Sequence, residues 1–500
     1  MKTEAKFTFE KVRHDQENEL HLVVSMKAPK TDWEKDRAPI CVVPVIDISG
    51  SMGGPPLDYA KKSAIKLVEH LSDKDFAGVV VFASDVELIS APVRMTQQNK
   101  DMLRQRIGDL CTRGCTNFSG GMLMGLDEVK KADIPDGTIK RIIMLTDGHA
   151  NQGVAVDYPS LSALLSKERG DVTVSCFGYG EGADQELLAS LAKDGKGNYA
   201  FIQNPDDALS AFAKELGGLL STYAQNIEVV IEANNGHVIQ GVLSDVDADG
   251  DDKKVTVKLP EILSDETIHV VSNVKLSKQS KALPRAMTAF NVKVSYDLLN
   301  KDGGRDTKTE SLTAKIKFVK EGKEDTKPDA DLDKVVANAE IVKAQNESER
   351  LAQAGDYRGA QLHLESLSGR LGARGLDQYA TYTSTLGSKV GSAGAFAASA
   401  SYRTSGKLAM TRAKGASSVH ADVLDDAAFL ANDMDTDVQK ELKRSFNDGE
   451  AKIVQPTKPN VNLNIPAPKV LQPIVKPTPD VKITTKDSSD TSIKKSRKRW

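Results

Sequence analysis

The chain contains a carboxylate and two hydroxyls at alternate positions, Asp47, Ser49 and Ser51. An apolar run at residues 40–46 comes directly before them and predicts a buried strand, and residues 57–68 have helical periodicity. The three polar side chains therefore lie where a strand ends and the chain turns toward a helix. If this segment stays extended, alternation by two points all three side chains to one side. Three hard oxygen ligands suit Mg2+, which prefers oxygen at about 2.0–2.1 Å and usually keeps several waters.

Two further segments carry side chains of the same chemistry. Residues 141–148 predict a second buried strand, which ends in Asp147 and a glycine. Residues 114–121 are a polar, glycine-bearing loop with Thr116 near its start, and this loop opens a helix. Because parallel strands place their carboxyl ends at one edge of a sheet, we expect these residues to form a single site. Turn and helix-cap residues that hold no metal are the alternative explanation of the same pattern.

In these segments the chain resembles the von Willebrand factor type A (VWA) family. Its metal ion-dependent adhesion site has five positions, and the chain matches all of them with Asp47, Ser49, Ser51, Thr116 and Asp147. The resemblance implies Mg2+ as the bound ion, with Mn2+ and Ca2+ as alternatives. It also implies that one coordination position stays open, to be filled by an Asp or Glu carboxylate of a protein partner. The function expected from it is Mg2+-dependent protein–protein interaction.

Two other functions compete with this one. A metal-dependent hydrolase needs a general base or a second metal beside the ion. His149 and Asp85 are candidates for the base, but no spacing pairs them, so we predict that the protein is not an enzyme. The other alternative is a structural subunit of a large assembly, for example a viral one, or an adaptor for an AAA+ ATPase.

Composition limits where the protein works and what it binds. With 500 residues the chain exceeds what one hydrophobic core usually serves. Only four cysteines occur, which indicates a reducing compartment, and we expect neither a secretory signal nor a membrane span. The predicted location is cytoplasmic, or nuclear in a eukaryote because of the basic residues 494–499. The net charge of −3 combines an acidic body with a basic tail, so we expect no nucleic-acid binding by the folded body and contacts of the tail with acidic surfaces.

The order of strand and helix patterns predicts an α/β fold with several further parts. Strands alternate with helices from about residue 39, which is typical of a doubly wound, mostly parallel, Rossmann-like sheet, and the last helix is predicted at 206–223. Short strands then indicate a β-sandwich. This arrangement resembles a VWA subgroup of bacteria and plants that carries a β-rich and helical extension. The predicted parts are 1–38, strands that pair with the sandwich; 39–224, the VWA domain; 225–322, the β-sandwich; 328–448, a helical region with a Gly/Ala/Ser-rich stretch; and 449–500, a disordered Pro/Lys-rich basic tail.

Three smaller features have simpler interpretations. Residues 245–251 imitate the start of a calcium-binding EF-hand loop, but Thr256 stands where a bidentate Glu is needed, so we predict a solvated hairpin turn. Cys111 and Cys115 have no second pair at zinc-binding spacing, so we interpret them as reduced thiols. Residues 329–369 are expected to form two antiparallel helices packed on the sandwich.

Overall fold

The computed structural model describes residues 1–31, 37–180 and 182–399, together with 402, 403, 406, 439, 440 and 442. All of them belong to the first of the two units into which the chain divides, residues 1–452. The second unit, 453–500, and the whole of the predicted basic tail, 449–500, lie outside the described residues.

The site-bearing part of the chain is a six-stranded sheet in the order β6-β5-β4-β7-β8-β9. Its strands are β4 (Ile40–Asp47), β5 (Phe76–Phe82), β6 (Val86–Arg94), β7 (Ile139–Thr146), β8 (Thr173–Tyr179) and β9 (Lys196–Ile202). Only β6 runs antiparallel to its neighbour. The strands β4, β5, β7 and β8 are buried along almost their whole length, because helices cover both faces of the sheet. This confirms the predicted mostly parallel α/β fold.

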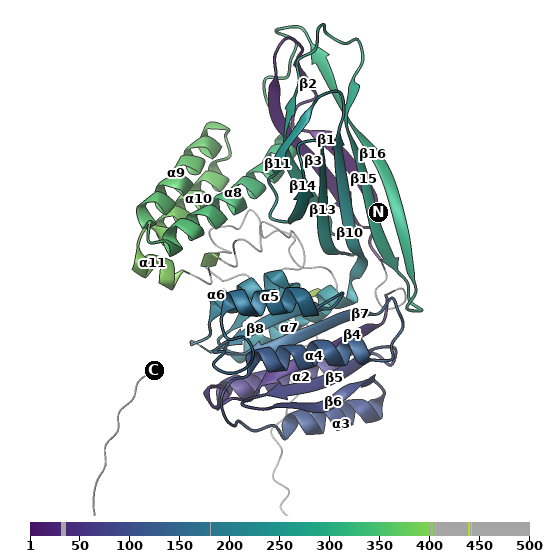
Figure 1. Cartoon of the computed structure of the whole chain (residues 1–500), viewed down its shortest axis with the longest axis vertical. Helices are drawn as coiled ribbons and strands as arrows, with labels where there is room; N and C mark the ends of the chain where they lie inside the picture. The colour runs from purple at the N-terminus through teal and green to yellow at the C-terminus, as the bar shows by residue number, and fades with distance from the viewer. Residues whose placement is uncertain are drawn as a thin grey trace, which may run out of the picture. The chain divides into compact units, whose positions relative to one another are not determined.

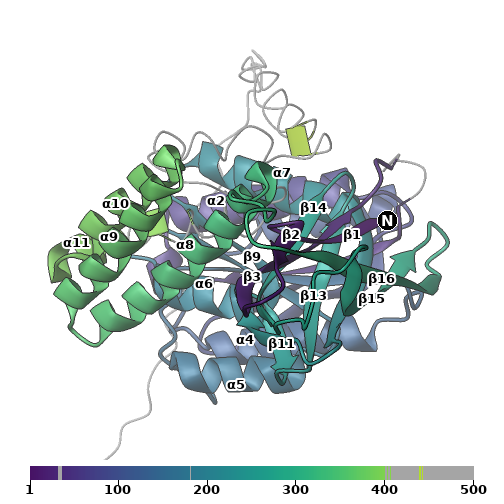
Figure 2. The same ribbon diagram turned by 90° about the horizontal axis from the view of Figure 1, so that it is seen from above.

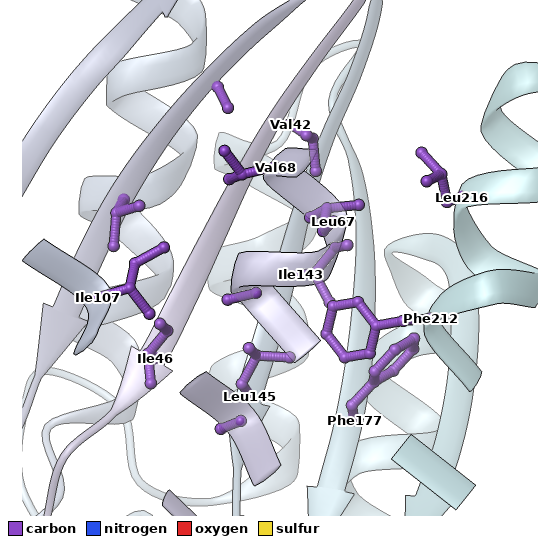
Figure 3. Close-up of a cluster of buried hydrophobic side chains, with 14 of the residues drawn as sticks. Val42, Ile46, Leu67, Val68, Ile107, Ile143, Leu145, Phe177, Phe212 and Leu216 are labelled. Atoms are coloured by element: carbon purple, nitrogen blue, oxygen red, sulfur yellow. The ribbon is translucent and has the colours of Figure 1, made fainter. Parts of the chain in front are cut away.

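Six helices cover this sheet in two layers (Figure 1). One layer contains α2 (Pro55–His70), α3 (Gln97–Gly108) and α7 (Pro205–Leu220), and the other contains α4 (Phe118–Lys131), α5 (Tyr158–Glu168) and α6 (Gln185–Asp194). Alternation along β4 separates the two cores: Val42 and Ile46 pack toward α2 and α7, whereas Val43 and Val45 pack toward α4. In the first core Phe177 meets Phe212 edge to face, with ring centroids 4.8 Å apart (Figure 3).

The remaining strands form two further sheets, in the orders β1-β3-β14-β11 and β12-β13-β10-β15-β16-β2, which enclose a common hydrophobic core. All pairs in these sheets are antiparallel except β16 with β2. The strands are β1 (Lys2–Phe7), β2 (Lys11–Arg13), β3 (Asn18–Lys27), β10 (Thr222–Ala233), β11 (Val238–Val242), β12 (Asp247–Gly250), β13 (Lys254–Leu263), β14 (Thr267–Leu276), β15 (Met287–Leu299) and β16 (Arg305–Val319).

The first three strands of the chain belong to these two sheets. Strand β3 lies between β1 and β14, and Val24 is paired with Val270 across a sequence separation of nearly 250 residues. The strand-and-helix domain between β3 and β10 is therefore inserted, in the order of the chain, into the middle of the sandwich. Figure 2 shows β1, β2 and β3 alongside β13–β16.

Among the residues described after the sandwich there are four helices: α8 (Ala330–Gln353), α9 (Tyr357–Ala373), α10 (Asp377–Val390) and α11 (Ala393–Ala398). Val336 of α8 packs on Val23 and Val271 of the sandwich. Helices α8 and α9 occupy the range 329–369, for which two helices were expected. Helix α10 forms beyond that range, and its Tyr382, Leu386 and Val390 are fully buried against α8 and α9. Within the described part of the chain, every helix is too short or too polar to cross a lipid bilayer.

Two local expectations differ from the structure. Helix α7 ends at Leu220 instead of residue 223, because Thr222 and Ala224 already pair with Leu263 and Ile262 in the sandwich. In the acidic segment 245–251, residues Asp247–Gly250 form the edge strand β12. The turn comes after it, where Asp251 Oδ1 accepts hydrogen bonds from the backbone N–H groups of Lys253 and Lys254, both at 2.8 Å.

Candidate functional site

Asp47 is the last residue of β4, and its side chain is held in one orientation. It is fully buried. Its Oδ1 accepts a hydrogen bond from the backbone N–H of Ser49 at 2.8 Å, and its Oδ2 accepts one from Thr146 Oγ1 at 2.6 Å. Strands β4 and β7 are adjacent and parallel, so the carboxyl ends of both deliver side chains to this point. The Asp47 carboxylate is thus fixed by its own turn and by the neighbouring strand.

Ser49 and Ser51 extend the site from β4 toward α2. Ser49 is buried and begins the single helical turn η1 (Gly50–Met52) in an extended conformation. Its Oγ lies 3.2 Å from Ser51 Oγ, and Ser51 is exposed. The two hydroxyls therefore form a pair that leads from the buried Asp47 to the surface.

The loop before α4 brings Thr116 to the same end of the sheet. Backbone hydrogen bonds join this loop to the Asp47 turn, from the Arg113 N–H to the Ile48 carbonyl at 2.6 Å and from the Gly50 N–H to the Gly114 carbonyl at 3.2 Å. Thr116 itself is 1% exposed. Its backbone N–H donates to Asn151 Oδ1 at 2.9 Å. The chain after β7 thus fixes the position of this threonine.

Asp147 follows directly after β7. Its Oδ1 accepts a hydrogen bond from the His149 N–H at 3.3 Å, and its backbone carbonyl accepts one from the Asp184 N–H at 3.1 Å. Gly148 then turns the chain with a φ of +79°, and a Cβ there would meet Leu188 at 3.1 Å. A glycine is needed at this position because other residues rarely adopt a positive φ.

The five residues expected at the site thus all lie at the carboxyl ends of β4 and β7 or on the loop bonded to them. The other candidates do not join them. His149 and Asp85 are both exposed. The His149 ring lies next to Gly182, since a Cβ added to Gly182 would be 3.6 Å from His149 Nε2. Cys111 and Cys115 are exposed free thiols on the Thr116 loop. No described contact joins any of these side chains to Asp47.

Sequence reasoning missed two residues that hold the site in place. Thr146 donates to Asp47, and Asn151 accepts from Thr116. A polar residue in the last position of an otherwise apolar strand is a signal that could have identified Thr146. Asn151 lies in a loop rich in small and polar residues, and nothing in its local sequence distinguishes it.

The buried Asp47 carboxylate is in an unfavourable electrostatic environment. Burial raises its pKa to about 6, the hydrogen bonds from Ser49 and Thr146 oppose this rise, and the charge of Asp147 adds to it. Among the described residues, no basic side chain forms an ion pair with Asp47 or Asp147. A cation beside the two carboxylates would supply the missing positive charge.

The donor chemistry fits a hard divalent cation. Carboxylate and hydroxyl oxygens are the ligand types that Mg2+ prefers, and the set leaves coordination positions for water. It differs from sites built mainly of acids or of nitrogen and sulfur ligands. Accordingly, the described residues contain no group of three or more His, Cys, Asp or Glu side chains placed to hold a metal ion. This set has only two carboxylates.

Comparison with known proteins agrees with this architecture. The profile of the von Willebrand factor type A domain matches residues 42–215. An uncharacterized protein of Synechocystis sp. is 25% identical over 290 residues, which are 56% of this chain and 66% of that protein. The human inter-alpha-trypsin inhibitor heavy chain H3 is 28% identical over 186 residues, 36% of this chain and 21% of that protein. The chain therefore spans less than two thirds of the length of either relative.

A solved structure extends the likeness beyond the matched domain. The structure titled von Willebrand factor type A from Catenulispora acidiphila superimposes with a TM-score of 0.59 at 18% identity, over 76% of this chain and 89% of that one. At this identity the likeness concerns the fold alone. VWA domains usually mediate protein–protein interaction. From the matched profile and the sheet described above, residues 42–215 of this chain form a von Willebrand factor type A domain.

Proposed function

We propose that the protein binds a partner protein through a Mg2+ ion held by Asp47, Ser49, Ser51, Thr116 and Asp147. The observation that carries this proposal is the fully buried Asp47 carboxylate, oriented by Ser49 and Thr146 and without a basic partner among the described residues. A buried charge of this kind is costly unless an opposite charge lies beside it. A Mg2+ ion bound between Asp47 and Asp147 would supply that opposite charge. The hydroxyl side chains would provide the protein's remaining ligands.

An incomplete set of ligands is what makes such an ion useful for recognition. When bound, Mg2+ supplies a compact positive centre that attracts a carboxylate more strongly than neutral hydroxyls do. Ser51 is exposed, so the site opens to the surface on that side. An Asp or Glu side chain of a partner protein fits this opening by charge and by ligand type.

Direct metal binding is the first test. Calorimetric titration of MgCl2 into the full chain should show binding that is lost in Asp47→Ala and Thr116→Ala. Asp127→Ala is the matched control, because Asp127 is an exposed acid on α4 whose only described partner is Lys131. Unchanged Mg2+ affinity in Asp47→Ala would refute the assignment of the site.

Partner binding is the second test. The same proteins are immobilised and exposed to native lysate in Mg2+ or in EDTA. Wild type and Asp127→Ala should retain a partner in Mg2+ but not in EDTA, and Asp47→Ala and Thr116→Ala should retain none in either buffer. Partners that bind all proteins equally in both buffers would move the interaction to another surface. Circular dichroism of each variant provides the control for folding.

A further inference from the structure

An exposed apolar segment lies beside the proposed metal site. Five large hydrophobic side chains are exposed in the part of the chain that the structure describes, and three of them fall within 154–158. Val154 is 79% exposed, Val156 45% and Tyr158 40%. Tyr158 has a polar partner, since its hydroxyl donates to Asp194 at 3.0 Å, but the two valines offer only methyl groups. Such a concentration of exposed apolar side chains marks a candidate interaction surface.

This segment is held in a defined position. The backbone N–H groups of Asn151 and Gln152 both donate to the Thr116 carbonyl, at 3.2 and 3.1 Å. Further along, the Ala155 N–H donates to Ser119 Oγ at 3.3 Å, and Ala155 is only 6% exposed. With Ala155 directed inward, Val154 and Val156 on either side of it are left at the surface.

A glycine next to the valines shows how closely the segment packs on the Thr116 loop. Gly153 has a φ of +113°, and a Cβ on it would lie 2.2 Å from Ser119 Oγ and 2.3 Å from Asn117 Oδ1. No side chain fits between this backbone and the start of α4. The two valines therefore keep a fixed relation to Thr116, one of the proposed ligands.

We propose that Val154 and Val156 form an apolar subsite for the same partner segment whose carboxylate binds at the metal. This inference rests on the proposed function and adds the chemistry of the partner: an acidic side chain with a hydrophobic side chain close to it in sequence. Asn151 accepts a hydrogen bond from Thr116, and Val154 is three residues further along the chain. Three residues span at most about 11 Å, so Val154 lies within that distance of Asn151. An extended peptide covers that distance in about three residues. The preferred partner thus carries Leu, Ile, Val or Phe two to four residues from its Asp or Glu.

The test uses the full chain and three synthetic peptides. The first contains Asp followed three residues later by Leu in a Gly/Ser background, the second has Ser in place of that Leu, and the third has Asn in place of the Asp. The Thr116 methyl signal in NMR spectra reports the carboxylate end, and the Val154 and Val156 methyl signals report the apolar end. We expect the Asp/Leu peptide to bind about tenfold tighter than the Asp/Ser peptide in Mg2+, a difference of about 1.4 kcal/mol. The Asn peptide should not shift the Thr116 signal.

A double variant separates the two parts of the site. Val154→Ser with Val156→Ser should bind Mg2+ and the Asp/Ser peptide as wild type does, but lose the tenfold preference for Leu. Leu362→Ser is the matched control, because Leu362 is 53% exposed on α9, outside the metal-site loops. Equal affinities of the Asp/Leu and Asp/Ser peptides for wild type would overturn the apolar subsite and leave the metal proposal intact.

Other outcomes have equally definite meanings. If calorimetry detects Mg2+ but no peptide shifts the Thr116 methyl signal, both carboxylate capture and the apolar subsite are wrong. If no Mg2+ binds, the proposed function itself fails. If the valine methyl signals shift with protein concentration in the absence of peptide, a second copy of the chain covers this surface, and that result also overturns the inference.

Discussion

Replacing Asp47 by Asn should stabilise the metal-free protein while it abolishes stabilisation by Mg2+. The side chain keeps its shape in this variant but loses its charge. In metal-free protein the pKa of Asp47 is raised from 3.8 to about 6 by burial. At about 1.4 kcal/mol per pH unit, the charged form of this carboxylate costs the folded state roughly 3 kcal/mol at pH 7.

Part of this gain is lost through hydrogen bonding. The introduced Asn side chain would still accept from the Ser49 N–H, but its NH2 group would face Thr146 Oγ1, which already accepts a hydrogen bond from the Gly148 N–H at 2.9 Å. The Thr146 hydroxyl hydrogen then has no acceptor, at a cost of about 1 kcal/mol. A net stabilisation of about 2 kcal/mol remains, which corresponds to a rise in melting temperature of about 4–8 °C for a domain of this size.

The direction of the pH dependence follows from the raised pKa. The folded state holds the Asp47 proton more tightly than the unfolded chain does, so this carboxyl lowers stability as the pH rises from about 4 through about 6. The advantage of Asp47→Asn over wild type in EDTA should therefore shrink to about a third between pH 7 and pH 5, because the cost of the buried charge falls by about half while the hydrogen-bond loss stays the same. A stability difference between Asp47→Asn and wild type that stays constant with pH would show that burial of the Asp47 charge is not its cause.

The assay is calorimetric unfolding in EDTA and in Mg2+. Wild type should gain about 2.7 kcal/mol at a Mg2+ concentration of about one hundred times Kd, and Asp47→Asn should gain nothing. Asp127→Asn on the exposed face of α4 is the control and should behave as wild type in both buffers. A variant that is less stable than wild type in EDTA, or that Mg2+ stabilises equally, would refute the reasoning.

Three further predictions concern residues around this site and beneath it. Asn151→Ala removes the acceptor of the Thr116 N–H and should weaken Mg2+ binding at least tenfold in calorimetric titration, since residues that orient metal ligands typically contribute this much; unchanged affinity would show that Asn151 does not position the loop. Gly121→Ala places a Cβ 2.6 Å from Phe82 and should lower the free energy of unfolding in urea by about 1–3 kcal/mol. The control is Gly369→Ala on the exposed face of α9, where a Cβ has no neighbour within 4 Å, and it should be neutral or stabilising. Arg141 forms ion pairs with Glu215 at 2.7 Å and Glu261 at 3.0 Å, and Arg141→Met leaves these two buried acids without that cation. The variant should lose about 3–5 kcal/mol of folding stability, measured by hydrogen exchange of β7. A loss of stability below about 1 kcal/mol would mean that the two acids find other partners.

The parallel sheet could be predicted from the sequence because strands that are buried on both faces are continuous apolar runs. Residues 40–46 and 142–145 are all apolar, mainly Val and Ile, and the polar residues that follow each run, Asp47 in one case and Thr146 with Asp147 in the other, lie at an edge where strand ends gather. The same rule brought Asp47 and Asp147 together as candidates. Their role as metal ligands stays a prediction.

What could not be predicted depends on contacts between distant residues. The place of Thr146 at the end of an apolar strand marks it as a candidate, but its acceptor is Asp47 on the neighbouring strand β4, and the local sequence does not identify that partner. Helix α10 is rich in Thr, Ser and Gly, which are poor helix formers, and the burial of Tyr382 and Leu386 against α8 and α9 outweighs that preference. Strand β12 is short and acidic, so its pairing with β13 left no alternation in the sequence.

The position of β3 within the sandwich has a consequence for biosynthesis. Its partner β14 and the strand β10 are encoded after the whole inserted domain, about 195 residues later in the case of β10. Because β14 begins about 240 residues after β3 ends, the ribosome leaves the β1–β3 hairpin without β14 for roughly 12–50 s at about 5–20 residues per second. During this interval the inserted domain can complete its own parallel sheet, whereas the early hairpin exposes Leu22, Val24 and Met26. Those strands are the part of the nascent chain that most needs a chaperone, and slowing translation between residues 28 and 221 should increase misfolding of the sandwich more than that of the inserted domain.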